Sequence, residues 1–435
     1  MTETTLIVGA GMTGLAAGMT SGLPVLEAVA GPGGICSSYY LRPGESEPLA
    51  DPASGTADAY RFEIGGGHWI FGGDPVVLNF LHRLVEMNRY ARRSSVYFPD
   101  SAKYVPYPIQ NNLRFLERAV AVQALEEMAR PGGGVETMLE WLETSFGATL
   151  TERFFGPFHD LYTAGLHRRI APQDPYKSPV DLALALRGAF SDAPAVGYNT
   201  TFLYPRQGLD ELARRMAARC RVEYGCPVTG FDTERREVVL ADGGRRPYRD
   251  VLSTLPLNRA LELAGLEVQA PADPHTAVLV LNIGARRGPA CPDDHWLYIP
   301  YSYAGFHRVG FYSNVDDSFL PADRPGERVS IYVERAYAGD APRPSAAEVE
   351  AYGRQVVDEL TRWGFIDGAE VVHPTWIDVA YTWSWPGSIW QRQALAVLEE
   401  AGIHQIGRYG RWIFQGIADS IRDGFIAGSS FRPLG

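Results

Sequence analysis

The chain has 435 residues, of which 46% are hydrophobic and 21% charged, and its formal net charge is −11. The hydrophobic share excludes a disordered chain, and the length allows two or three domains at roughly 150 residues per domain. With 51 acidic against 40 basic side chains and no basic run, the chain lacks the electrostatic footprint of a protein that binds nucleic acid or anionic membranes. We therefore expect neither partner.

The sequence also indicates where the protein works. No stretch approaches the ~18 consecutive apolar residues of a membrane span, and no basic segment followed by an apolar one precedes the first predicted strand. The cysteines form no CxxC pair, so they predict neither a zinc site nor a disulfide framework; they are Cys36, Cys220, Cys226 and Cys291. We expect a cytoplasmic protein without a metal site.

The first thirty residues contain a glycine-rich turn between a predicted strand and a predicted helix. The strand spans Thr4–Val8, and Gly9, Gly11 and Gly14 follow it as GxGxxG. In such a turn the first glycine permits the bend, the second lets the backbone approach a pyrophosphate, and the third lets helix and strand pack closely. Glu27 stands 18 residues after Gly9. This is near the spacing of about 20 residues for a carboxylate that binds an adenosine ribose, so the pattern predicts a dinucleotide-binding cradle.

A second glycine pair indicates which dinucleotide is bound. Gly33 and Gly34, in the sequence GPGG, follow the predicted strand that ends at Glu27. The run VLEA…GPGG after a GxGxxG strand resembles the FAD fingerprint of the amine-oxidase and UDP-galactopyranose mutase superfamily. In that superfamily the second glycine pair touches the flavin side of the pyrophosphate. The resemblance therefore favours FAD over NAD.

The remaining elements are expected in chain order from hydrophobic periodicity. Strands are expected at Leu23–Leu26, Arg221–Glu223, Glu237–Leu240, Val251–Leu255, Ala277–Ile283, Trp296–Ile299, Arg308–Tyr312 and Arg328–Glu334. The region Pro75–Ser145 is expected to be mostly helical, with helices at Leu113–Met128 and Val135–Phe146 and a loop at Asp100–Asn112. Further helices are expected at Leu209–Cys220, at Ser345–Trp363 and from about Asp419, followed by a tail at Gly424–Gly435, and Glu45–Tyr60 is expected to be a surface loop.

This order of elements predicts an α/β fold: a Rossmann-like FAD-binding domain with an inserted helical domain and an antiparallel β-sheet domain. The FAD-binding domain would comprise residues 1–74, 199–262 and 400–435. Residues 75–180 would form the mainly helical insertion, and residues 181–198 and 263–399 the antiparallel sheet that contacts substrate.

Four further stretches resemble UDP-galactopyranose mutase, particularly its longer eukaryotic-type branch. They are EIGGGHWIF (Glu63–Phe71), VPYPIQNN (Val105–Asn112), HWLYIP with FHRVGFYSN (His295–Asn314), and GRYGRW followed by ADSI (Gly407–Ile421). In that family the first stretch lies beside the flavin, the second faces the uridine, the third carries a diphosphate-binding arginine, and the fourth closes over the flavin. Together they are far more specific than a dinucleotide fingerprint alone.

The resemblance implies a set of site residues. The candidate catalytic residues are His68, beside the flavin, and Arg308, at the substrate diphosphate, assisted by Tyr381 and Lys177. The implied cofactor-binding residues are Gly9, Gly11, Gly14, Glu27, Gly33, Gly34, Gly66, Gly67, His68, Val228, Arg408, Asp419, Ser420 and Ile421. The implied substrate-binding residues are Tyr107, Ile109, Gln110, His159, Arg308, Tyr381, Trp412 and Phe414.

The chain departs from the family pattern at three positions. Phe414 stands where the family has a tyrosine that donates to the diphosphate, His159 where it has an asparagine, and Leu161 where it has a lysine. A histidine offers a nucleotide base other hydrogen-bond donors and acceptors than an amide does, so the sequence does not determine which nucleotide is bound. The chain resembles a divergent member of the family.

The resemblance implies a flavin-dependent pyranose/furanose mutase that acts on a nucleotide-activated or related sugar. The reaction is redox-neutral: N5 of reduced FAD attacks the anomeric carbon, so a reductant such as NAD(P)H or a reductase is an expected partner. The alternative is an FAD-dependent oxidoreductase of the amine-oxidase or desaturase type, which would need an apolar tunnel and no anion-binding arginine. The sequence leaves the oligomeric state open.

Overall fold

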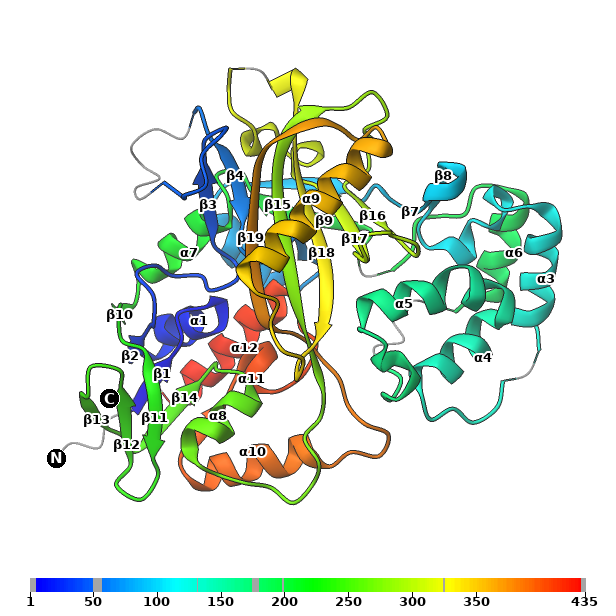
Figure 1. The fold of residues 1–435 in the computed structure, drawn as a ribbon. Helices are drawn as coiled ribbons and strands as arrows, with labels where there is room; N and C mark the ends of the chain where they lie inside the picture. The colour runs from blue at the N-terminus through cyan, green and yellow to red at the C-terminus, as the bar shows by residue number, and fades with distance from the viewer. Residues whose placement is uncertain are drawn as a thin grey trace.

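The computed structural model describes residues 5–49, 57–130, 132–173, 180–197, 199–323 and 325–431. Figure 1 shows three parts: a parallel sheet with its helices at lower left, a long antiparallel sheet in the centre, and a group of helices at right. Among the described residues no helix is both long and apolar enough to cross a bilayer. The cysteines Cys36, Cys220, Cys226 and Cys291 are free thiols.

The first part is built on a five-stranded parallel sheet. Its strands lie in the order β10 (Arg221–Glu223), β2 (Pro24–Leu26), β1 (Thr5–Val8), β14 (Asp250–Ser253) and β20 (Ile403–Gln405). Both faces of β1 are covered: Leu6, Ile7 and Val8 are all buried, which explains a continuous apolar run rather than an alternating one. Because the strands come from three separated stretches of chain, the segments between them form the other two parts.

Helices cover both faces of this sheet. They are α1 (Met12–Ser21), α2 (Pro75–Leu84), α7 (Leu209–Ala217), α8 (Leu257–Ala264), α10 (Trp390–Glu400), α11 (Gly407–Gly410) and α12 (Ile417–Ser430). The packing of α12 on α1 is unusually close, because Gly424 and Gly428 face the α1 backbone. A Cβ on Gly424 would lie 2.2 Å from the carbonyl oxygen of Thr13, and one on Gly428 2.3 Å from that of Ala17.

Three small antiparallel sheets surround the parallel sheet. One contains β11 (Val228–Asp232), β12 (Glu237–Leu240) and β13 (Arg245–Pro247). The second pairs β3 (Ser38–Leu41) with β4 (Tyr60–Glu63), and the third orders β5 (Ile70–Phe71), β9 (Thr201–Pro205) and β6 (Met87–Ala91). The loop between β4 and β5 carries the GGH sequence and leads into the centre of the molecule.

The second part is a seven-stranded sheet that packs against the first. Its order is β19 (Ile366–Thr382), β15 (His275–Arg287), β18 (Arg328–Ala338), β17 (Arg308–Phe311), β16 (Trp296–Tyr298), β7 (Ser94–Phe98) and β8 (Lys103–Pro106). On β18, Ile331 and Val333 lie in the core beneath α9 (Ala346–Arg362), whereas Tyr332 faces the opposite core. Two-residue alternation therefore directs Glu334 away from α9 and toward the interface with the first part.

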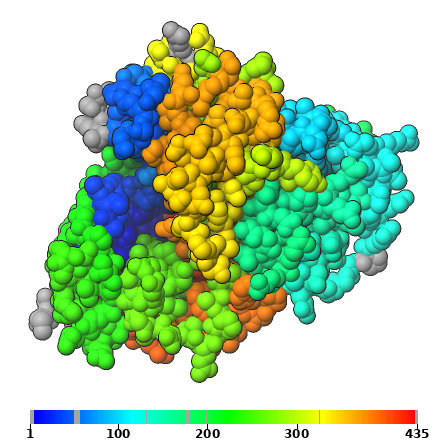
Figure 2. All heavy atoms as spheres, in the orientation of Figure 1, coloured from blue at the N-terminus to red at the C-terminus, as the bar shows by residue number. Residues whose placement is uncertain are grey.

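The third part is helical and lies beside the edge of the antiparallel sheet. It contains α3 (Arg118–Met128), α4 (Met138–Leu150), the π-helical turn η5 (Thr151–Phe155), α5 (Gly156–Tyr162) and α6 (Leu182–Phe190). Its core is aromatic: Phe146 stacks on Phe155 at a ring distance of 4.1 Å. Figure 2 shows this part packed against the antiparallel sheet.

The predicted α/β fold is confirmed, and so are most of the predicted strands from Arg221 to Glu334, within a few residues at their ends. The expectation for residues 85–106 is wrong, because this segment forms β6, β7 and β8 rather than helix and loop. Its period is two: Val96 and Val105 face the helical part, and Tyr97 and Tyr104 face the core beneath α9.

Two further expectations also differ from the structure. The tail expected from Gly424 is helical, because α12 continues to Ser430 and uses its glycines to pack on α1. Residues 182–190, expected with the antiparallel sheet, form α6, and the backbone of Gly188 in α6 lies against Asn111 in the helical part.

The packing of α12 on α1 gives a test of the fold. Gly428→Ala places a Cβ against the Ala17 carbonyl, so we expect a loss of ~1–3 kcal/mol in the free energy of unfolding. Ser429→Ala creates the same residue one position later on an exposed part of α12, so it should leave stability nearly unchanged. Urea titrations of both variants measure the difference; equal midpoints would contradict the close packing.

Candidate active site

A single elongated cavity of about 850 Å³ lies where the three parts meet. Its lining comes from the carboxyl ends of β1, β2 and β14, the first turns of α1 and α12, the GGH loop, and strands β15, β17, β18 and β19. The far wall comes from η5 and α5 of the helical part. The cavity therefore runs from the predicted dinucleotide cradle to the antiparallel sheet and beyond it to the helices.

The glycine turn at one end of the cavity has the geometry that the sequence predicts. Gly9 has a φ of +97°, and a Cβ there would lie 2.2 Å from Oγ1 of Thr254. A Cβ on Gly14 would lie 1.9 Å from the Gly9 carbonyl oxygen, so this glycine allows the helix to touch the strand. Gly11 is the N-cap of α1 and makes no side-chain cap bond, which leaves the first amides of the helix facing the cavity. Gly11 also bridges to Gly33, so both glycine pairs meet at one point.

Glu27 closes the cradle. One oxygen of its carboxylate accepts from the amide of Ala10 at 2.6 Å and the other from the amide of Val29 at 3.1 Å. Val228 lines the cavity near this carboxylate, together with Cys226 and Pro227. These bonds hold the carboxylate at the end of β2, the position expected for a group that binds a ribose hydroxyl pair.

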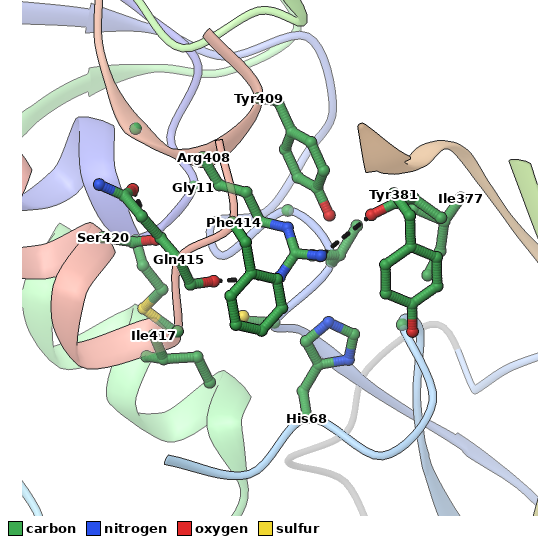
Figure 3. A pocket seen from close by; sticks show the side chains of 18 of the residues that line it. Gly11, His68, Ile377, Tyr381, Arg408, Tyr409, Phe414, Gln415, Ile417 and Ser420 are labelled. Carbon is green, nitrogen blue, oxygen red and sulfur yellow. Dashed lines mark hydrogen bonds between the residues drawn. The ribbon is translucent and has the colours of Figure 1, made fainter. Parts of the chain in front are cut away.

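The first turn of α12 and the segment before it form the opposite rim. Gly416 is the N-cap of α12, and Asp419 accepts from its amide at 3.2 Å. The guanidinium of Arg408 donates to the carbonyls of Gln415, at 3.0 Å, and Ala380, at 3.1 Å. Figure 3 shows Arg408 between the rings of Phe414 and Tyr381, with His68 facing it. Its guanidinium carbon lies 4.7 Å from the centre of the Phe414 ring.

The GGH loop positions His68 in the cavity. A Cβ on Gly67 would lie 2.1 Å from the hydroxyl oxygen of Tyr332, so only glycine allows the loop to pack on β18. Burial, together with the nearby charge of Arg408, lowers the pKa of His68 to about 4. Among the described residues Nδ1 of His68 has no hydrogen-bond partner. The loop thus presents a neutral imidazole to the cavity, with Nδ1 packed against the loop's own backbone at Gly65.

Arg308 and Glu334 form a buried ion pair in the cavity wall. They are direct cross-strand partners on β17 and β18, and Nη2 of Arg308 lies 2.8 Å from Oε2 of Glu334. Nη2 also donates to the hydroxyl of Tyr381 at 2.8 Å. Burial alone would raise the pKa of Glu334, but the adjacent Arg308 outweighs it and lowers that pKa below its usual value. Both groups are therefore charged, and the pair is neutral as a whole.

The far wall of the cavity is aromatic. Phe154, Phe155, Phe158, His159 and Tyr162 line it from η5 and α5, opposite Tyr107 and Tyr298. The rings of Tyr107 and Tyr298 lie 4.4 Å apart, and those of Tyr162 and Tyr381 4.7 Å apart. The polar Asn199 also lines the cavity, and its side-chain oxygen accepts from Arg92.

Most of the predicted site residues meet in this cavity. Those that line it are Gly9, Gly11, Glu27, Gly33, Gly34, Gly67, His68, Tyr107, His159, Val228, Arg308, Tyr381, Arg408, Phe414, Asp419 and Ser420. Gly14 and Gly66 lie directly behind the lining and act through the backbone. Lys177 lies outside the described residues.

Besides Gly14 and Gly66, four described residues of the predicted site do not line the cavity. Ile109 and Ile421 are fully buried in the hydrophobic cores, and Gln110 is buried in the 3-10 turn after β8. The indole of Trp412 donates to the carbonyl of Trp383 at 3.1 Å and packs edge-on against another tryptophan. These residues support the wall through packing rather than through contact with the cavity.

Glu334, Asn199 and most of the aromatic wall line the cavity but are not among the site residues expected from the sequence. The sequence does contain one signal for Glu334, which is the only carboxylate in the largely apolar segment IYVERAY. The residues two positions before and after it, Tyr332 and Ala336, point to the same face of the strand and are buried. The aromatic wall has no comparable signal, because Phe154, Phe155 and Phe158 read as helical core residues.

The lining fits a flavin dinucleotide. Two helix N-termini, of α1 and α12, open onto the cavity, and the N-cap residue of each is a glycine, which leaves room for a pyrophosphate at one and a flavin ring edge at the other. The glycines of the cradle carry no side chains that would keep a ligand away from the backbone. The cavity volume lies in the upper part of the range of about 300–1,000 Å³ for small-molecule pockets. FAD would be held by the cradle, Glu27, Val228, the GGH loop and the first turn of α12.

The chain is similar to known proteins in family and in fold. A model of the family described as flavin containing amine oxidoreductase matches residues 22–427. Among solved structures, the chain is similar to a reduced UDP-galactopyranose mutase at 20% identity, with a TM-score of 0.84 over 98% of this chain and 95% of that one. It is also similar to a putative protoporphyrinogen oxidase from Exiguobacterium sp. 255-15 at 13% identity, with a TM-score of 0.70 over 99% and 98% of the two chains.

A putrescine oxidase is similar at 16% identity, with a TM-score of 0.56 over 98% of each chain. Identities this low show a shared fold, not a shared reaction. The family model, by contrast, spans most of the chain and implies a flavin cofactor, FAD. The protein belongs to the flavin-containing amine oxidoreductase family.

Proposed function

We propose that the protein is a flavin-dependent pyranose/furanose mutase that acts, with its FAD reduced, on a sugar activated by a nucleotide diphosphate or a related anionic leaving group. The observation that carries the proposal is the placement of Arg308. Its guanidinium lies in the wall of the cavity between the flavin side, marked by His68, and the aromatic wall of α5. A mutase needs a cation at this point, because the leaving group gains charge when the anomeric bond breaks.

Arg308 and Tyr381 are arranged to receive an anionic oxygen. Glu334 and Tyr381 both engage Nη2 of Arg308, which fixes the plane of the guanidinium. The side chain stays 20% exposed, and a guanidinium has five N–H donors, so donors remain for the cavity. Since the hydroxyl of Tyr381 accepts from Arg308, its own proton is available to a second oxygen of the leaving group.

His68 contributes a neutral group on the flavin side. Reduced FAD, when bound, supplies the nucleophile of the reaction, so the protein need not supply one. With a pKa of about 4, His68 remains uncharged at neutral pH, so the imidazole borders the flavin side of the cavity without adding charge. The aromatic wall offers flat faces on which a base or a sugar ring can stack and excludes water from the site.

A second candidate function is that of an FAD-dependent oxidase or desaturase. Two observations favour it: the wall beyond Arg308 contains Phe154, Phe155 and Phe158, and Phe414 lacks the hydroxyl of the mutase pattern. An apolar substrate would pack well against these phenylalanine rings. It would, however, leave the charged pair of Arg308 and Glu334 in contact with apolar groups, which is costly.

The two functions differ in their need for reduced flavin. We expect the FAD-loaded protein, reduced with dithionite without air, to convert one or more of UDP-galactose, UDP-glucose and the corresponding dTDP-sugars to the furanose form. The oxidised protein should convert none. Anaerobic incubation followed by anion-exchange chromatography and NMR detects the product. Substrate-dependent oxygen uptake without ring contraction would overturn the mutase and favour the oxidase.

The role of Arg308 can be tested by a variant that keeps the charge. Arg308→Lys retains a partner for Glu334 but loses the planar fork, and hydrogen bonds to charged groups contribute ~1.5–3 kcal/mol, so we expect the affinity for the sugar diphosphate to fall about tenfold or more. Arg335→Lys is the matched control on β18, since Arg335 contacts Tyr337 and Tyr352 outside the cavity. Calorimetric titration measures both; equal affinities would remove Arg308 from the substrate site.

The cradle can be tested at Glu27. Glu27→Gln loses an anionic acceptor at the predicted ribose position and disturbs the bonds to Ala10 and Val29, so we expect FAD to bind about tenfold more weakly, a loss of ~1–2 kcal/mol. Glu223→Gln lies on the neighbouring strand β10, where the carboxylate is exposed and pairs with Arg246 at 3.7 Å, and should retain FAD. Fluorescence titration of FAD into the apoprotein measures both. Unchanged affinity in Glu27→Gln would contradict the assignment.

A further inference from the structure

His307, the residue before Arg308, is completely buried beside the ion pair and has no role in the site as described so far. Its Nε2 lies 3.4 Å from Oε2 of Glu334, the same oxygen that lies 2.8 Å from Nη2 of Arg308. Among the described residues Nδ1 of His307 has no hydrogen-bond partner, and Nε2 has only this long contact with Glu334. Buried polar atoms without partners are rare in folded proteins, so this imidazole calls for a physical reason.

The charges around His307 balance only while the cavity holds no anion. Burial lowers the pKa of His307, so the imidazole is neutral at neutral pH. Glu334 and Arg308 carry opposite charges, and the three side chains together are neutral. A diphosphate at Arg308 would bring negative charge close to the carboxylate of Glu334, in a site with little water to screen it.

We propose that His307 is a positioning residue that takes up one proton from solvent when an anionic substrate binds at Arg308, and that Glu334 then divides its carboxylate between Arg308 and the resulting imidazolium. The inference rests on the proposed function, since it takes the substrate to be anionic. The proton is released when the anion leaves, so no other reactant is needed. Glu334 stays ionised throughout and is balanced by a second cation, which frees Arg308 to turn its donors toward the substrate.

Among the described residues that contact the ring of His307, Glu334 is the one that carries a negative charge. His307 faces Glu334 of β18 and directly precedes Arg308, the first residue of β17. From α5, the rings of Tyr162 and Phe158 pack on the imidazole at 5.3 and 6.0 Å. Neither ring carries a charge at neutral pH, so the charges next to the imidazole are those of Glu334 and Arg308, and an anion bound at Arg308 would add to them.

Calorimetry measures the proton directly. UDP-glucose, dTDP-glucose and ADP-glucose are suitable probes, because a diphosphate esterified at both ends keeps its charge constant between about pH 5 and 8. Titrating each into the FAD-loaded protein in buffers of different ionisation enthalpy gives the number of protons taken up per ligand bound. We expect uptake approaching one proton within the range of pH 6 to 8. Because binding would raise the pKa of His307, the affinity should weaken as pH rises through that range, by up to tenfold per pH unit.

Two variants and one control isolate His307. His307→Asn and His307→Gln should bind the ligand without proton uptake, and their affinity should not vary with pH in this range. His295→Asn is the matched control: His295 is also buried, burial lowers its pKa to about 4, and it lies outside the cavity lining. It should keep the proton uptake of the wild-type protein. A purely structural role of His307 would change affinity or stability without changing the proton count.

Three results would overturn the inference. Wild-type binding without proton uptake would show that His307 stays neutral, and would leave the mutase proposal intact. Undiminished uptake in both His307 variants would place the proton on Glu334 instead. Failure of all three probes to bind would show that Arg308 is not an anion site, whereas the mutase proposal itself is judged separately by the isomerisation assay with reduced FAD.

Discussion

The close packing of one phenol between two glycines sets the geometry of the whole site. A Cβ on Gly67 would lie 2.1 Å from the hydroxyl oxygen of Tyr332, and a Cβ on Gly310 1.9 Å from the ring carbon that bears it. Gly67 directly precedes His68, and Gly310 follows Arg308 by two residues on β17. The Tyr332 ring therefore fixes the distance between the loop that carries His68 and the strand that carries Arg308. Any larger residue at either glycine would separate the two halves of the site.

The cradle could be predicted from the sequence because each of its features depends on residues close together in the chain. Gly9, Gly14 and Glu27 act through one turn, one helix start and one strand end, and their structural consequences are local. The strands of the antiparallel sheet could also be predicted from local sequence. In Arg328–Ala338, for example, Val329, Ile331 and Val333 are apolar at every second position. The segment 85–106 could not, because its strands form by pairing with β9 and β16, far along the chain.

The charged part of the site depends on strand register, which a single sequence does not determine. Arg308 was a candidate through its motif, but its partner Glu334 is fixed only by the pairing of β17 with β18. The same pairing brings His307 beside that carboxylate. The aromatic wall depends on a still longer-range contact, the placement of α5 against β18, so neither pattern nor propensity could assign Phe158 to the cavity rather than to the helical core.

The two arginines of the cavity have different tasks, although the motif treats both as ligand contacts. Both terminal nitrogens of Arg408 donate to main-chain carbonyls, so it ties the end of β19 to the segment before α12, and Phe414 covers its face. Its charge helps to keep His68 neutral, and these two bonds hold the guanidinium in the fold. In Arg308, Nη2 is bound to side chains, those of Glu334 and Tyr381, and a ligand could bind to the same groups. The net charge of −11 is a property of the whole chain and does not describe the charge inside the cavity. Recognition of an anion there would depend on whether Arg308 can give up part of its interaction with Glu334 and bind the anion instead.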